Sequence, residues 1–150
     1  MNKGKRMRIL LVEDQPSAVR LVQEVLKENN GYHNLYVAKD GGEAMAFLHR
    51  EGDHALAPRP DLILLDLSVP KKDGREVLAE IKTDDKLKRI PVVILTVSES
   101  EEDILKTYNL QANCYIIKPI HLRQFAEIIK SVRNFWLTIV TLPPSQTPHG

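Results

Sequence analysis

The stretch Leu62 to Gly74, LILLDLSVPKKDG, contains the feature that decides the fold. Consecutive branched apolar residues are followed at once by Asp66, and then by a loop rich in lysine, proline and glycine. A continuous apolar run of this kind is typical of a strand that is covered on both faces, as in a parallel sheet. The carboxylate at its end is either the first polar residue past the core or part of a site. The rest of the chain distinguishes between these two interpretations.

Composition indicates one globular domain. The chain has 150 residues, of which 43% are hydrophobic and 27% charged, and no apolar run approaches the ~20 residues of a membrane span. A net charge of +1 gives no electrostatic attraction to nucleic acid. The lone Cys114 excludes an internal disulfide, and the apolar run after the basic start is too short for a signal peptide. We therefore expect a cytoplasmic protein that binds neither membrane nor nucleic acid.

Four more segments are predicted to be strands. Residues 8–13 and 91–96 repeat the continuous apolar pattern of 61–66, and residues 34–38 and 113–117 form shorter apolar runs. Helical patterns, with apolar residues at three- and four-residue spacing, alternate with these strands at 18–26, 42–50, 74–82, 100–108 and 122–136. This alternation predicts an α/β protein with a doubly wound parallel sheet of five strands and helices on both faces.

Polar side chains stand where the predicted strands end. The residues after the first, third, fourth and fifth strands are Glu13 and Asp14, Asp66, Thr96, and Lys118 and Pro119. Because ligands bind at the carboxyl ends of the strands in an open α/β sheet, we expect these side chains to lie close together. Clustered carboxylates repel one another and require a cation, and hard oxygen ligands favour Mg²⁺. We predict that Asp14 and Asp66 are its ligands.

A lysine and a threonine beside a magnesium site suit a phosphoryl group. The ammonium of Lys118 neutralises phosphoryl oxygens and the hydroxyl of Thr96 donates to another. Asp66 can then act as a nucleophile that attacks a phosphohistidine or a small acyl phosphate and becomes an aspartyl phosphate. In this hypothesis phosphorylation gives Thr96 and Lys118 a partner that they lacked before.

The motifs at these strand ends resemble the receiver domain of two-component response regulators. They are VED at 12–14, LLDLSVPKKDG at 64–74, ILT at 94–96 and YIIKP at 115–119. The resemblance covers residues 8 to about 133 and implies the flavodoxin-like strand order 2-1-3-4-5. It leaves residues 134–150 as a C-terminal extension of a single receiver domain.

The resemblance also implies a role for each site residue. Asp66 is the phosphoacceptor, Glu13 and Asp14 form the acidic pair, the backbone carbonyl of Ser68 completes the magnesium site, and Thr96 and Lys118 bind the phosphoryl group. Thr96, Tyr115 and Pro119 form the switch, and the peptide bond before Pro119 is usually cis in the family. Val97 stands where the family usually has a smaller residue.

The last third of the chain resembles the single-domain response regulators that accompany bacterial and cyanobacterial phytochromes. NCYIIKP and FWLTIVTLP carry this resemblance, which implies a light-sensing histidine kinase as the phosphoryl donor. The segment with Phe135, Trp136 and Leu142 is apolar on more than one side, so we expect a homodimer through it. The alternative is that this segment folds back on its own domain.

Other interpretations compete with the phosphorylation switch. A phosphatase of the haloacid-dehalogenase type also forms an aspartyl phosphate, but it has a second aspartate where this chain has Ser68. A transcription factor needs a longer segment after the last predicted helix. Taken singly, Asp66 could be a strand-end residue, Asp14 a helix N-cap, and Glu13 a solvated residue that contacts the ion through water. Together they favour a signalling protein and not an enzyme that acts on an external metabolite.

Overall fold

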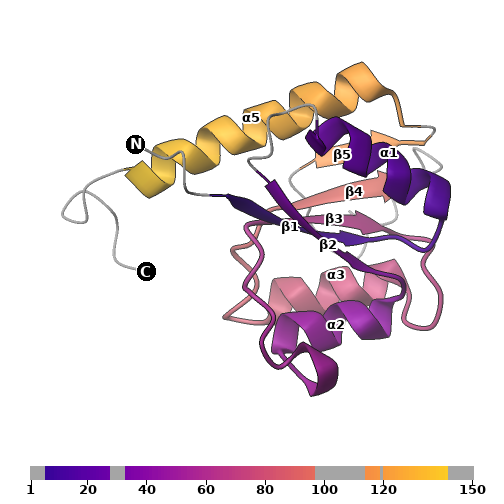
Figure 1. The fold of residues 1–150 in the computed structure, drawn as a ribbon. Coiled ribbons are helices and arrows are strands. Elements are labelled where there is room, and N and C mark those ends of the chain that lie inside the picture. The colour runs from indigo at the N-terminus through magenta and orange to yellow at the C-terminus, as the bar shows by residue number, and fades with distance from the viewer. Residues whose placement is uncertain (1–5, 28–32, 97–113, 119, 142–150) are drawn as a thin grey trace.

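The computed structural model describes residues 6–27, 33–96, 114–118 and 120–141 (Figure 1). Its parallel strands are β1 (Met7–Val12), β2 (His33–Ala38), β3 (Leu62–Asp66), β4 (Val92–Thr96) and β5 (Cys114–Ile117). They form one five-stranded sheet in the order β2-β1-β3-β4-β5. The predicted doubly wound sheet and its strand order are confirmed.

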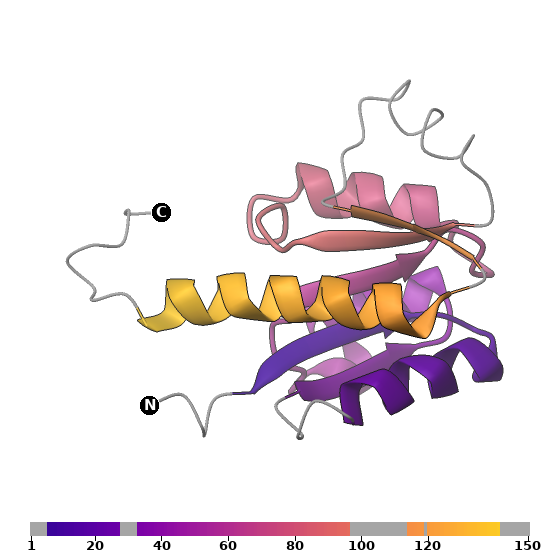
Figure 2. The ribbon, with the colours of Figure 1, turned by 90° about the horizontal axis from the view of Figure 1, so that it is seen from above.

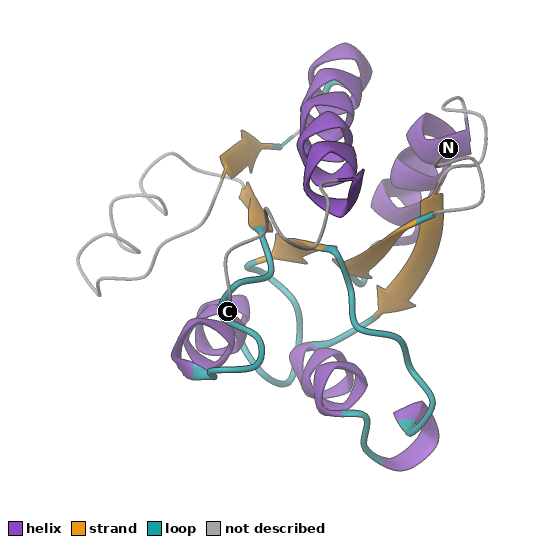
Figure 3. Ribbon diagram, turned by 90° about the vertical axis from the view of Figure 1, so that its left-hand side faces the viewer, coloured by secondary structure: helices purple, strands orange, loops and turns teal. Residues whose placement is uncertain are grey.

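Helices cover both faces of this sheet (Figures 2 and 3). They are α1 (Pro16–Lys27), α2 (Gly41–His49), the short 3-10 helix η1 (Gly52–His54), α3 (Gly74–Thr83) and α5 (Leu122–Thr141). Figure 3 shows α1 and α5 on one face and α2 and α3 on the other. The helix predicted at 100–108 lies outside the described residues. No helix in the described ranges is both long and apolar enough to cross a membrane.

The core consists of two apolar layers, one on each face of the sheet. Every residue of β3 is buried, and alternate side chains of the strands point into opposite layers. Leu10, Ile63 and Leu65 belong to the layer under α2 and α3. The opposite layer contains Phe125 and Ile129 of α5, both fully buried. Burial on both faces is the reason why the strands read as continuous apolar runs.

The start of α3 is pressed against the end of β3. Asp73 caps the helix by accepting a hydrogen bond from the backbone N–H of Arg75, at 2.7 Å. The N–H of Gly74 donates to the carbonyl of Leu67, at 3.3 Å. A Cβ atom on Gly74 would lie 2.5 Å from the Cα of Leu67, so only glycine fits without displacement of the strand end. This contact fixes both ends of the loop that follows Asp66.

One buried polar residue, His33 at the start of β2, stands out from the apolar core. Its side chain is nearly inaccessible, and neither ring nitrogen has a hydrogen-bond partner among the residues that the structure describes. Burial, together with the positive charge of Arg133, lowers the pKa of His33 from 6.5 to about 4. The folded protein therefore holds this imidazole in its neutral form.

This depressed pKa predicts destabilisation in acid. As pH falls from 6.5 to about 4 the unfolded chain takes up a proton that the folded chain resists, so the free energy of unfolding falls. The loss from this residue is roughly 3 kcal/mol and levels off below about pH 4. Urea unfolding across this range should show a shallower decline for His33→Gln than for the wild type. The exposed His121 provides the control, because His121→Gln should leave the decline unchanged; equal slopes for all three proteins would contradict this assignment.

Candidate functional site

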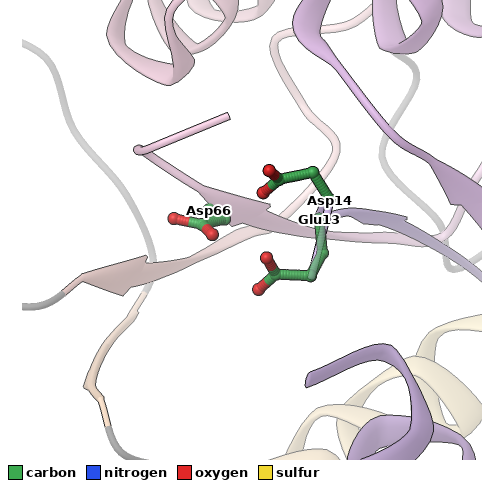
Figure 4. Close-up of side chains that lie close together, drawn as sticks. All are labelled: Glu13, Asp14 and Asp66. Atoms are coloured by element: carbon green, nitrogen blue, oxygen red, sulfur yellow. The ribbon is translucent and has the colours of Figure 1, made fainter. Parts of the chain in front are cut away.

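Three carboxylates meet at the carboxyl ends of β1 and β3 (Figure 4). The two strands are neighbours, with Val12 paired with Leu65, so the residues that follow emerge side by side. Glu13, Asp14 and Asp66 each offer an oxygen within 4.8 Å of the others. The side chains of Glu13 and Asp66 are buried, and that of Asp14 is exposed. The three carboxylates of the predicted cluster therefore lie close together in the structure.

Lys118 lies between the two buried carboxylates. Its Nζ donates to Oδ2 of Asp66 at 2.8 Å and to Oε1 of Glu13 at 2.9 Å. Its side chain is only 14% exposed, so water screens these ion pairs weakly. The expectation that Lys118 lacks a partner before phosphorylation is therefore wrong. Two buried carboxylates need a nearby cation, and the ammonium provides that charge.

The two oxygens of Asp66 have different partners. Oδ1 accepts a hydrogen bond from the backbone N–H of Ser68, at 2.9 Å, and Oδ2 accepts from Lys118. The bond to Ser68 closes a local turn that holds the carboxylate in one orientation. This contact uses the backbone N–H of Ser68, whereas the predicted metal contact uses its carbonyl, which stays a prediction.

Glu13 is buried, whereas the alternative interpretation expected a solvated residue at the strand end. Its side chain is fully buried, and its backbone N–H donates to the carbonyl of Ala38, at 2.9 Å. Burial raises the pKa of Glu13 to about 7, and the hydrogen bond with Asp66 adds to the rise while Lys118 opposes it. Burial alone lowers the pKa of Lys118, but its bonds to Asp66 and Glu13 outweigh this and raise it, so the ammonium stays charged.

The remaining predicted site residues have different positions. Thr96 is the last residue of β4 and pairs with Ile117 of β5, which brings its backbone to the same edge of the sheet. Tyr115 is half-buried and packs against the layer under α2 and α3. Pro119 and Val97 lie outside the described residues. So does Leu142 of the predicted interface, whereas Phe135 and Trp136 belong to α5.

The loop after Asp66 is attached to α2 by contacts that the sequence did not predict. The N–H of Gly41 donates to the carbonyl of Pro70, at 3.4 Å, and Lys71 forms an ion pair with Asp40, at 3.5 Å. A Cβ atom on Gly41 would lie 2.0 Å from the carbonyl oxygen of Lys72. The sequence feature that could have predicted this contact is the Asp-Gly pair at 40–41. Such a pair marks a break in regular structure, and glycine is used where the backbone comes close to another segment.

This site combines carboxylates that suit a hard divalent cation with an ammonium that suits a phosphoryl group. Carboxylates and a lysine at the carboxyl ends of strands in the order 2-1-3-4-5 define a phosphate-accepting receiver domain. The family model described as "Response regulator receiver domain" matches residues 9–130. The chain belongs to this family, which confirms the resemblance seen in its motifs.

Known proteins are similar over nearly the whole chain. The response regulator Rcp1 of Synechocystis sp. is 53% identical over 135 residues, which are 90% of this chain and 92% of Rcp1. Among solved structures, the phosphorylated cyanobacterial phytochrome response regulator RcpA is 54% identical with a TM-score of 0.76, and the match covers 92% of this chain and 99% of RcpA. The Mn²⁺-bound form of Rcp1 is 52% identical with a TM-score of 0.75, over 91% and 99% of the two chains.

Receiver domains are signalling domains whose cofactor is a divalent cation, Mg²⁺. The residues of this chain fit that cofactor: three carboxylates approach one another, and the exposed one, Asp14, is open to an ion that arrives from solvent. Lys118 already neutralises part of the charge of Asp66 and Glu13, so an ion that binds there adds positive charge beside an ammonium. The affinity of the site for Mg²⁺ therefore depends on Lys118 as well as on the carboxylates.

This competition leads to a prediction for Lys118→Ala. Without added metal the variant should unfold about 3 kcal/mol more easily than the wild type, because two buried carboxylates lose their counter-charge. Mg²⁺ should recover more stability in the variant than it adds to the wild type, since the ion replaces the lost charge. Urea unfolding in EDTA and in MgCl₂ measures both effects, with the exposed Lys130→Ala as control. An equal gain from Mg²⁺ in variant and wild type would contradict the competition.

Proposed function

We propose that Asp66 accepts a phosphoryl group from a histidine kinase and that the resulting charge switches the surface of the domain. The observation that carries this proposal is the environment of Asp66: a buried carboxylate at a strand end, held at one oxygen by Ser68 and at the other by Lys118. Phosphoryl acceptance is typical of the receiver family. The proposed metal ligands are Asp14, Asp66 and the carbonyl of Ser68, with Glu13 in a supporting position.

The chemistry follows from these contacts. An oxygen of Asp66 forms a bond to phosphorus while the bond from phosphorus to the donor imidazole nitrogen breaks, and that nitrogen leaves with the electron pair. A bound Mg²⁺ neutralises charge on the phosphoryl oxygens. Lys118 exchanges its bond to the Asp66 carboxylate for one to a phosphoryl oxygen, and it keeps its bond to Glu13. Glu13 thus anchors the ammonium while the acceptor changes its charge.

The proposed switch is a local change with an effect on the surface. The Thr96 hydroxyl is proposed to donate to the phosphoryl group, and Tyr115 then to turn toward the space that this leaves. Pro119 is proposed to hold the backbone after Lys118. The half-burial of Tyr115 supports this role, because a half-buried ring has both an apolar contact and an open side.

Phosphotransfer should depend on the carboxylate of Asp66. With a phosphorylated histidine kinase and Mg²⁺, the wild type should gain acid-labile phosphate, and Asp66→Asn should gain none because its amide is a poor nucleophile. The exposed Asp53→Asn is the matched control and should be labelled at the wild-type rate. Phosphate on the Asp66→Asn variant at a comparable rate would reject the acceptor assignment.

We further propose that the donor is a phytochrome with histidine kinase activity. The similarity to RcpA and Rcp1 over nine-tenths of the chain supports this, since RcpA is a phytochrome response regulator. In this proposal the domain works in the cytoplasm, binds no nucleic acid, and acts as a signalling switch and not as a turnover enzyme. The single cysteine is in keeping with a cytoplasmic location, and the near-zero net charge is in keeping with a protein that does not bind nucleic acid.

The oligomeric state proposed is a homodimer of single receiver domains with an extension from about residue 134. The support is the apolar sequence of residues 135–142, which begins within α5. A second copy of the same surface can cover these side chains by a two-fold contact. Burial of several hundred Å² at about 25 cal/mol per Å² gives several kcal/mol before the cost of association.

The dimer proposal is tested by the mass in solution. Sedimentation equilibrium should give twice the chain mass for the wild type and the chain mass for the double variant Trp136→Ala with Leu142→Ser, because the variant loses apolar contact area. The exposed apolar residue Leu56 supplies the control, and Leu56→Ser should leave the dimer intact. A monomeric wild type, or a dimer that survives the double substitution, rejects this interface.

A further inference from the structure

A cleft opens at the end of the sheet opposite to Asp66. It has a volume of about 680 Å³. The end of α2 and the loops before β3 and β4 line it, and Figure 1 shows these loops at the left, beyond the amino ends of both strands. The phosphoacceptor site lies at the carboxyl ends of the same strands, so the cleft is a separate site.

The cleft is lined mainly by positive charge. Its charged and titratable lining residues are His49, Arg50, Arg59, Asp85, Lys86 and Arg89. Asp85, the carboxylate among them, is bonded to Lys88 at 3.0 Å, and this hydrogen bond lowers the pKa of Asp85. The chain as a whole carries a charge of only +1, so this concentration of cations is local.

The guanidinium groups are available to a ligand. Within the described ranges, neither Arg50 nor Arg89 has a side-chain hydrogen bond or an ion pair. The side chain of Arg59 donates to the backbone carbonyl of Lys86, which ties the loop before β3 to the loop before β4. The partial negative charge at the C-terminus of α2 stabilises a cation at Arg50. Arg59 and Arg89 lie in loops before strands, so this helix end does not explain their positive charge.

Apolar residues also line the cleft. Its apolar lining residues are Leu48, Pro60 and Leu87, and all three are buried. The volume falls within the range of about 300–1,000 Å³ that small ligands occupy. Apolar residues and arginines in the same lining suit a flat ring that carries phosphate, because arginine both stacks on rings and binds phosphate through two parallel hydrogen bonds.

We propose that this cleft binds a small phosphorylated molecule with at least two negative charges and a flat ring, the chemistry of a nucleotide. The volume of about 680 Å³ favours such a ligand over an acidic protein surface, which needs a broader and flatter contact. Binding here does not depend on phosphorylation of Asp66, and the bridge from Arg59 to Lys86 holds the two walls in place.

The test uses adenosine 5′-diphosphate as the probe, in EDTA so that no metal bridges it to the carboxylates. Calorimetric titration should detect binding to the full chain, and the double variant Arg59→Gln with Arg89→Gln should bind at least about tenfold more weakly, since it loses two charge-assisted contacts. The control is Arg20→Gln with Arg123→Gln, two exposed arginines on α1 and α5. The control variant should bind as the wild type does.

Further probes identify which part of the ligand is recognised. Adenosine should not bind detectably, and inorganic pyrophosphate should bind more weakly than the diphosphate because it lacks the ring. Amide resonances of residues 48–50 and 85–89 should shift on titration. The proposal is overturned if binding of the diphosphate is undetectable, or if the control variant loses as much affinity for it as the Arg59→Gln with Arg89→Gln variant. It is also overturned if a polyglutamate peptide binds more tightly than the diphosphate, which would assign the cleft to a protein partner.

Discussion

The ion pairs of Lys118 with Glu13 and Asp66 are the constraint on which the site depends. They join the ends of β1 and β3 to the residue that follows β5, across the middle of the sheet. A buried carboxylate pair without this ammonium repels itself, and burial already raises the pKa of Glu13 with the ammonium in place. The same lysine therefore stabilises the fold and prepares the acceptor.

This arrangement sets what a phosphoryl group can change. Asp66 keeps its orientation through Ser68, and Glu13 keeps one bond to Lys118, so the ammonium has a fixed anchor and one exchangeable partner. A new anion on Asp66 can redirect the lysine without leaving Glu13 unpaired. The strand ends provide a rigid frame, and the charge distribution within that frame is the part that alters.

Much of the fold and of the carboxylate cluster could be predicted from the sequence. Continuous apolar runs predicted the strands because burial on both faces leaves no alternation, and polar residues at their ends predicted Glu13, Asp14 and Asp66 as a cluster. Sequence could not rank the burial of Glu13 and Asp14, because adjacent residues at a strand end point to opposite sides. It also could not reveal the bonds of Lys118, since these join residues 13 and 118 through the completed sheet.

The close approach of Gly41 to Lys72 has a consequence for how the domain varies and moves. Because the carbonyl of Lys72 occupies the space of any side chain at position 41, the loop after Asp66 and the first turn of α2 form one mechanical unit. A shift of that loop carries the start of α2 with it, so the effects of the acceptor extend to the face opposite α5. Any side chain at position 41 would displace Lys72, although this residue touches no reacting group.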